Sequence, residues 1–134
     1  METLFDGEFI SIRKSDITGC LEAIRKKDFS TKEHFRRALD EIVHQVSATN
    51  SDKIIGVGDL LRIVPDVHCL PTEAIPRLSV EGLKTFAIVI GKERNVQEYQ
   101  DLFDRILNWN TKISNINIKF FHTIEEARKW IKSL

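Results

Sequence analysis

The loop after the third predicted strand carries the side chains best suited to chemistry. Arg62, Asp66, His68 and Cys69 lie in this loop, and Asp59 lies near the end of the strand. A cysteine beside a histidine suggests a thiolate nucleophile with its base, which must lie within hydrogen-bond reach and be oriented by a third group. We expect no such dyad, because adjacent side chains in an extended loop point to different sides. Binding of a ligand or partner is the better interpretation.

A second group of polar side chains follows the next predicted strands. Lys92 and Arg94 come after the fourth strand, and His122 comes after the fifth. In open α/β sheets, ligands bind outside the carboxyl ends of the strands, and all of these loops would open onto that edge. The sequence therefore predicts a ligand- or partner-binding site formed by Asp59, Arg62, Asp66, His68, Lys92 and Arg94.

No motif for a nucleotide, a metal or another cofactor accompanies these residues. Gly56 and Gly58 invite comparison with phosphate-binding loops, but neither a third glycine at a helix start nor Gly-Lys-Ser/Thr follows them. His34 and His44 share a predicted helix at a spacing that does not suit metal ligands. We expect structural glycines, solvated histidines, no cofactor and no enzymatic activity.

A basic stretch surrounds the start of the first predicted helix. It runs from Arg25 to Arg37, and acidic residues that include Glu22 and Glu33 interleave with it. We interpret it as a solvated face rather than as a surface for anionic lipid or another acidic partner.

The second half of the chain alternates strand and helix. A continuous apolar strand at Thr85–Ile90 is followed by an amphipathic helix over Asn95–Asn110, a strand at Ile116–Phe121 and a helix that begins at Thr123. Buried apolar strands separated by helices are typical of a parallel sheet covered by helices. Right-handed crossovers would make the last three strands parallel.

The first half predicts a hairpin and two more helices. Strands at Glu8–Arg13 and Cys20–Arg25 are joined too closely to be parallel. A capping box of Ser30 and Glu33 predicts the start of the first helix. The third strand is expected at Ile54–Leu61. The second helix is expected from Pro71 to Gly82, kinked or shortened by Pro76.

These elements predict an α/β fold in one domain, residues 1–134. Its single five-stranded sheet is mixed and mostly parallel, with four helices in the order β-β-α-β-α-β-α-β-α. The predicted core consists of Leu39, Ile42, Phe86, Ile88, Ile116, Ile118 and Phe120. In the final helix, Thr123 and Glu126 form a second capping box, and Ala127, Ile131 and Leu134 are expected to face inward.

The composition is that of an ordinary globular protein. The 134 residues are 42% hydrophobic and 30% charged, with twenty basic and twenty acidic residues. A neutral chain has no long-range field to attract phosphate, which argues against nucleic acid as a partner. Weak self-repulsion leaves a homodimer open.

The cysteines and the N-terminal residues indicate a cytoplasmic protein. Cys20 and Cys69 are too few for a disulfide framework and are expected to be free thiols. No signal peptide is apparent. The longest apolar run, Phe86–Ile90, is far shorter than the roughly 20 residues that cross a bilayer, so we expect no integral membrane association.

Two passages resemble a known family. Residues 75–78 and 82–89 resemble the helix-glycine-strand passage of small bacterial STAS-like proteins, which share the SpoIIAA-like fold of anti-sigma-factor antagonists. Residues 120–131 are similar to the group's final strand and its F-x-x-x-E-E-A-x-x-W-[LI] helix. The resemblance implies this scaffold and a bacterial signalling role.

The family's phosphorylation site has no counterpart here. Phosphorylatable antagonists carry an Asp-Ser-Ser-Gly-like turn after the central strand, whereas residues 59–69 contain no serine or threonine. The nearest hydroxyl belongs to Thr72. Regulation at this position would have to come from binding through Arg62, Asp66 or His68.

We therefore expect a non-enzymatic regulatory or protein-interaction module. An apolar surface patch at the second helix or at Trp109 would favour it. The alternative is a binder or carrier of a small apolar ligand or lipid, held between the helices and the sheet beside the kinked second helix. A closed pocket of roughly 300 Å³ or more would favour that alternative.

Overall fold

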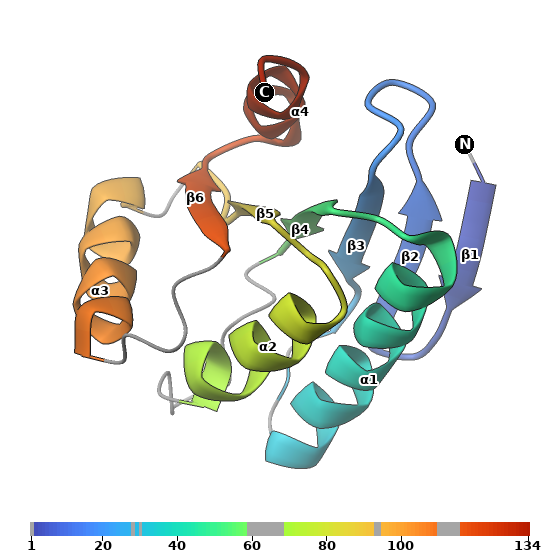
Figure 1. Cartoon of the computed structure of the whole chain (residues 1–134), viewed down its shortest axis with the longest axis horizontal. Coiled ribbons are helices and arrows are strands. Elements are labelled where there is room, and N and C mark those ends of the chain that lie inside the picture. The colour runs from blue at the N-terminus through green and yellow to red at the C-terminus, as the bar shows by residue number, and fades with distance from the viewer. Residues whose placement is uncertain (1, 28, 30, 59–68, 93–94, 110–115) are drawn as a thin grey trace.

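In the computed structural model, one mixed sheet lies between two layers of helices (Figure 1). The structure describes residues 2–27, 29, 31–58, 69–92, 95–109 and 116–134. The elements are β1 (Glu2–Asp6), β2 (Ile10–Lys14), β3 (Leu21–Arg25), α1 (Lys32–Thr49), β4 (Lys53–Val57), α2 (Cys69–Val80), β5 (Thr85–Val89), α3 (Val96–Trp109), β6 (Asn117–Phe121) and α4 (Ile124–Lys132).

The order of the strands across the sheet is β1-β2-β3-β4-β5-β6. β1 to β3 are antiparallel neighbours, and β3 to β6 are parallel neighbours. The predicted hairpin and the predicted parallel strands are therefore confirmed, as are the α/β class and, within the described residues, the four helices.

The predicted number of strands is wrong, because the described part of the sheet has six strands rather than five. The additional strand, β1, is an edge strand with Glu2, Thr3 and Asp6 exposed, and its pairing with β2 is irregular between Thr3 and Phe5. A short edge strand of this kind has no regular apolar alternation. β1 is a strand because its backbone pairs with β2, and its own residue pattern does not predict one.

The predicted start of α1 is one residue too early. Thr31 is the N-cap, and its side chain accepts a hydrogen bond from the backbone N–H of His34 at 3.1 Å. The other end of α1 closes at Asn50, whose φ of 54° lies in the left-handed region that asparagine tolerates. Ser30 lies outside the described residues.

The end of α2 follows the prediction, although the helix begins at Cys69 rather than at Pro71. Gly82 has a φ of 94° and donates its N–H to the Ser79 carbonyl at 3.0 Å. Leu83 donates to the Leu78 carbonyl at 3.1 Å, which completes a Schellman motif. Pro76 lies inside the helix without ending it.

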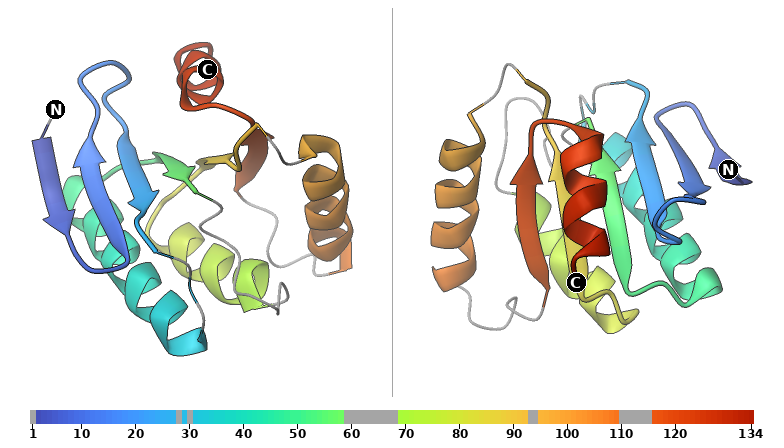
Figure 2. Two further views of the ribbon diagram at one scale, coloured as in Figure 1. Left: turned by 180° about the vertical axis from the view of Figure 1, so that it is seen from behind. Right: turned by 90° about the horizontal axis from the view of Figure 1, so that it is seen from above.

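Two hydrophobic clusters hold the layers together. The larger lies on the face covered by α1, α2 and α3 and contains every residue of the predicted core. The smaller lies on the opposite face, where Ala127 and Ile131 of α4 pack on β4, β5 and β6 (Figure 2). Leu134 does not join it, contrary to prediction: it follows the end of α4 and is 58% exposed.

Candidate functional site

Most of the predicted site lies outside the described residues: Asp59, Arg62, Asp66, His68 and Arg94. Lys92 is described and is exposed. Backbone hydrogen bonds continue past the strands at this edge, from Gly58 N–H to the Val89 carbonyl at 3.0 Å and from Ile90 N–H to the Phe121 carbonyl at 2.9 Å. The loops after β4 and β5 therefore start close together. The assignment of a site to them stays a prediction.

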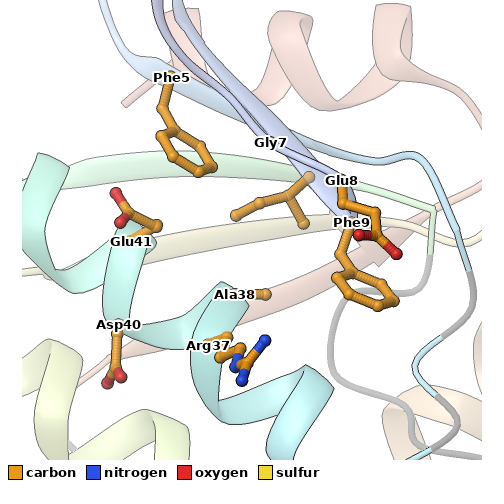
Figure 3. A pocket seen from close by; sticks show the side chains of 9 residues that line it. Phe5, Gly7, Glu8, Phe9, Arg37, Ala38, Asp40 and Glu41 are labelled. Atoms are coloured by element: carbon orange, nitrogen blue, oxygen red, sulfur yellow. The ribbon is translucent and has the colours of Figure 1, made fainter.

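A hollow opens at the same edge, beside the β1–β2 turn. Ile10, at the start of β2, pairs with Arg25, at the carboxyl end of β3, so the turn lies at the carboxyl edge of the parallel strands. The hollow has a volume of about 350 Å³ and is called here the turn hollow. Its lining residues are Phe5, Gly7, Glu8, Phe9, Ile10, Arg37, Ala38, Asp40 and Glu41. Arg37, Asp40 and Glu41 come from α1, across from Phe5 and Phe9, and Asp40 is turned away from the two rings (Figure 3).

The turn is held against the end of β3. The Gly7 N–H donates to the Ile10 carbonyl at 2.9 Å, and the Lys26 ammonium donates to the Gly7 carbonyl and to Asp6 Oδ1, each at 2.8 Å. The backbone N–H of Lys26 also donates to the Phe9 carbonyl at 2.7 Å. These bonds give the turn hollow a fixed wall.

Aromatic rings form much of the wall of the turn hollow. The Phe9 ring stacks on the His34 ring of α1, with 4.4 Å between ring centroids. Gly7 lies close under the Phe5 ring: a Cβ added to Gly7 would lie 2.6 Å from two atoms of that ring. Glycine at this position therefore lets the Phe5 ring occupy its observed place.

Three of the four charged lining side chains are ion-paired. The pairs are Arg37 with Glu33 at 2.7 Å, Asp40 with Arg77 at 2.7 Å, and Glu8 with Lys27 at 3.5 Å. The fourth, the half-buried Glu41, makes no ion pair with any residue that the structure describes. Among the described residues, the turn hollow thus combines aromatic and aliphatic lining with one carboxylate that makes no ion pair.

A second hollow, called here the helix hollow, lies between α1 and α2. Its volume is about 300 Å³, and its lining residues are Val43, Pro76, Arg77, Val80 and Glu81. Val80, the last residue of α2, is 84% exposed and places an apolar side chain at this hollow. The Asp40–Arg77 ion pair lies between the two hollows, because Asp40 lines one and Arg77 lines the other.

A hollow described between α1, α2 and the sheet is nearly filled by side chains. The hollow among Phe35, Leu39, Leu78 and their neighbours has a volume of about 10 Å³. A space of this size holds about one water molecule. This interior hollow offers no room for a lipid.

On the other face of the sheet, a buried carboxylate is fully engaged. Arg13 and Arg128 donate hydrogen bonds to both oxygens of Glu22, at 2.9 to 3.0 Å. Burial alone would raise the pKa of the Glu22 carboxyl, but the hydrogen bonds from Arg128 and Arg13 outweigh it and hold that pKa below its ordinary value. Such a group is a poor general base, so we assign it a structural role.

The prediction that Glu22 belongs to a solvated face is wrong, because its side chain is fully buried. The local charge pattern could not reveal the second arginine, which follows 106 residues later. In the predicted hairpin, Arg13 lies opposite Glu22, and this pairing could have indicated an ion pair from the sequence.

The thiol of Cys20 is also an unsuitable nucleophile. Cys20 is buried, and its Sγ lies 2.9 Å from the Thr18 hydroxyl. Burial raises the pKa of the thiol, which keeps it protonated near neutral pH.

Among the described residues, no three histidine, cysteine, aspartate or glutamate side chains gather as ligands for a metal ion. Over the same residues, no helix combines the length and the apolar character needed to cross a membrane. Comparison with models of known protein families, with curated proteins and with solved structures finds no match to this chain.

Proposed function

We propose that this chain is a non-enzymatic regulatory or protein-interaction module that docks a partner protein at the helix hollow. One observation carries the proposal: Val80 of α2 exposes 84% of its surface beside an open hollow of about 300 Å³. Partner proteins commonly bind by inserting a side chain into such a depression, with apolar contacts at its centre and polar groups at its rim. Here Val43, Pro76 and Val80 supply the apolar contacts, and Arg77 and Glu81 supply the polar rim.

The described groups with a shifted pKa support a binding role more than a catalytic one. Glu22 is ion-paired and Cys20 is kept neutral, so neither is prepared for proton transfer or attack. The alternative, a carrier of a small apolar ligand, gains no support from the interior hollow of about 10 Å³ between the helices and the sheet.

A STAS-like scaffold is part of the proposal. Two contacts within the closing motif, residues 120–131, support it. Thr123 caps α4 by accepting a hydrogen bond from the Glu126 N–H at 3.3 Å, and Trp130 packs on Phe121 with 5.5 Å between ring centroids. A cytoplasmic location and a bacterial signalling role stay predictions from the sequence.

The test is affinity capture with matched variants. Wild-type protein, Val80→Asp and Ile17→Asp would each be used as bait in a lysate of the native host, and the captured proteins identified by mass spectrometry. Ile17 is the control, because it is also an exposed apolar residue, at 49%, but lies in the turn between β2 and β3. The same partner should be recovered with wild type and Ile17→Asp and lost with Val80→Asp. Equal recovery with all three baits would refute docking at the helix hollow.

A further inference from the structure

The turn hollow has the chemistry of a site for a cationic side chain with an apolar stem. Its wall contains the Phe5 and Phe9 rings and the methyl group of Ala38. Its one unpaired charge, within the described residues, is the half-buried carboxylate of Glu41. An occupant that matches both features carries a positive charge at the end of an apolar stem.

We propose that the turn hollow binds an arginine side chain of the partner protein, with its guanidinium group at Glu41 and its stem along Phe5 and Phe9. This proposal rests on the proposed function in that the arginine belongs to the docked partner. A guanidinium group forms two parallel hydrogen bonds with a carboxylate and also stacks on aromatic rings. An ammonium group is more strongly hydrated and lacks the planar face, so lysine fits this combination less well.

The other charged residues of α1 that line the turn hollow are consistent with an arginine as its occupant. Asp40 is already paired with Arg77 at 2.7 Å, and Arg37 is already paired with Glu33 at 2.7 Å. Neither pair needs to break for a guanidinium group to reach Glu41. An anionic occupant would face Glu41 and would meet no free cation among the described lining residues, since Arg37 is paired with Glu33.

The two hollows can serve one partner. Arg37 and Glu41 line the turn hollow, and Val43 of the same helix lines the helix hollow. Glu41, where the guanidinium group would bind, and Val43 are two residues apart, which is about 3 Å along α1 and about 200° around it, so the two hollows flank α1 on different sides. A partner that fills both hollows would therefore cross the exposed face of α1, placing an apolar side chain on one side and an arginine on the other.

The arginine site can be tested without the partner. Isotope-labelled full-length protein would be titrated with Nα-acetyl-arginine N-methylamide and followed by NMR, with the backbone amides of Gly7, Phe9 and Glu41 as reporters. The corresponding lysine and norleucine compounds are the ligand controls. Glu41→Gln removes the charge while keeping the shape, and Glu98→Gln makes the same change on the exposed surface of α3. Gly7→Ala is a third variant, because its Cβ would displace the Phe5 ring.

We expect saturable shifts at the reporters with the arginine compound, and binding weakened about fivefold in Glu41→Gln but unchanged in Glu98→Gln, since only Glu41→Gln removes the charged partner of the guanidinium group. Binding should also be weaker in Gly7→Ala and with the lysine and norleucine compounds. The proposal is overturned if the arginine compound gives no saturable shift, if Glu41→Gln binds as well as wild type, or if lysine or norleucine binds equally well. If the shifts appear while Val80→Asp still captures the partner, the arginine site stands and docking at the helix hollow fails.

Discussion

Arg128 of α4 donates two hydrogen bonds to the buried carboxylate of Glu22 in β3, at 2.9 and 3.0 Å, across 106 residues of chain. Arg13 of β2 also donates a hydrogen bond to the Glu22 carboxylate, at 2.9 Å. One anion thus ties the helix on one face of the sheet to the antiparallel strands beside it.

Replacement of Arg128 by methionine should destabilise the protein. The buried Glu22 would keep only one of its two cations, and a buried charge that loses a partner costs about 2 kcal/mol or more. Urea denaturation would measure the loss in the free energy of unfolding. Lys129→Met, a change in the adjacent exposed residue, is the control and should shift it by less than about 0.5 kcal/mol. A similar small loss in Arg128→Met would show that Arg13 alone satisfies Glu22.

The stabilisation by Glu22 should depend on pH. Its folded pKa is held below the ordinary value of 4.5, so its contribution is present above that value and is lost as pH falls through the folded pKa. The difference in unfolding free energy between wild type and Glu22→Gln should therefore shrink on acidification. Denaturation of both proteins between about pH 6 and about pH 3 would measure it. A constant difference over this range would contradict the lowered pKa.

Leu39→Ala should cost about 2–5 kcal/mol, the usual range for a leucine truncated in a packed core. Leu39 of α1 is 2% exposed and lies in the larger hydrophobic cluster. Chemical denaturation would give the loss, and Ser47→Ala on the exposed side of α1 would show the effect of a substitution outside the core. A loss below about 1 kcal/mol would mean that the surrounding side chains close the cavity.

The protein should not accept phosphate from an anti-sigma-type serine kinase at the family's usual position. Phosphorylation needs a hydroxyl, and residues 59–69 contain none. Incubation with the kinase and ATP, followed by intact-mass measurement, should show an unchanged mass. A stoichiometric gain of one phosphate that maps to Thr72 would restore the phosphorylation switch.

Features set by local sequence were the most predictable. The cap at Thr123 and the left-handed Gly82 each depend on a few neighbouring residues, and both appear as expected. The core residues followed from continuous apolar strands and from the apolar stripe of α1. In each case the information needed to identify the feature lies within one or two turns of helix or one strand.

Features set by distant partners were missed. β1 is a strand because β2 pairs with it, and Glu22 is buried because Arg128 reaches it from the other end of the fold. The turn hollow was missed for the same reason: its wall comes from the β1–β2 turn and its charges come from α1. The turn hollow lies at the same edge of the sheet as the predicted site, but its side chains come from different segments, and the predicted site stays a prediction.

The order of the strands has a consequence for synthesis. Because the sheet runs β1-β2-β3-β4-β5-β6, each new strand emerging from the ribosome finds its partner already made, and none has to insert between two earlier ones. The sheet can therefore grow from one side as the chain lengthens. Glu22 can gain its second cationic partner only after Arg128 has been translated. Until then, among the residues that the structure describes, Arg13 is the one arginine that is paired with the Glu22 carboxylate in the growing chain. When α4 packs on the sheet, it covers that face and brings Arg128 to Glu22.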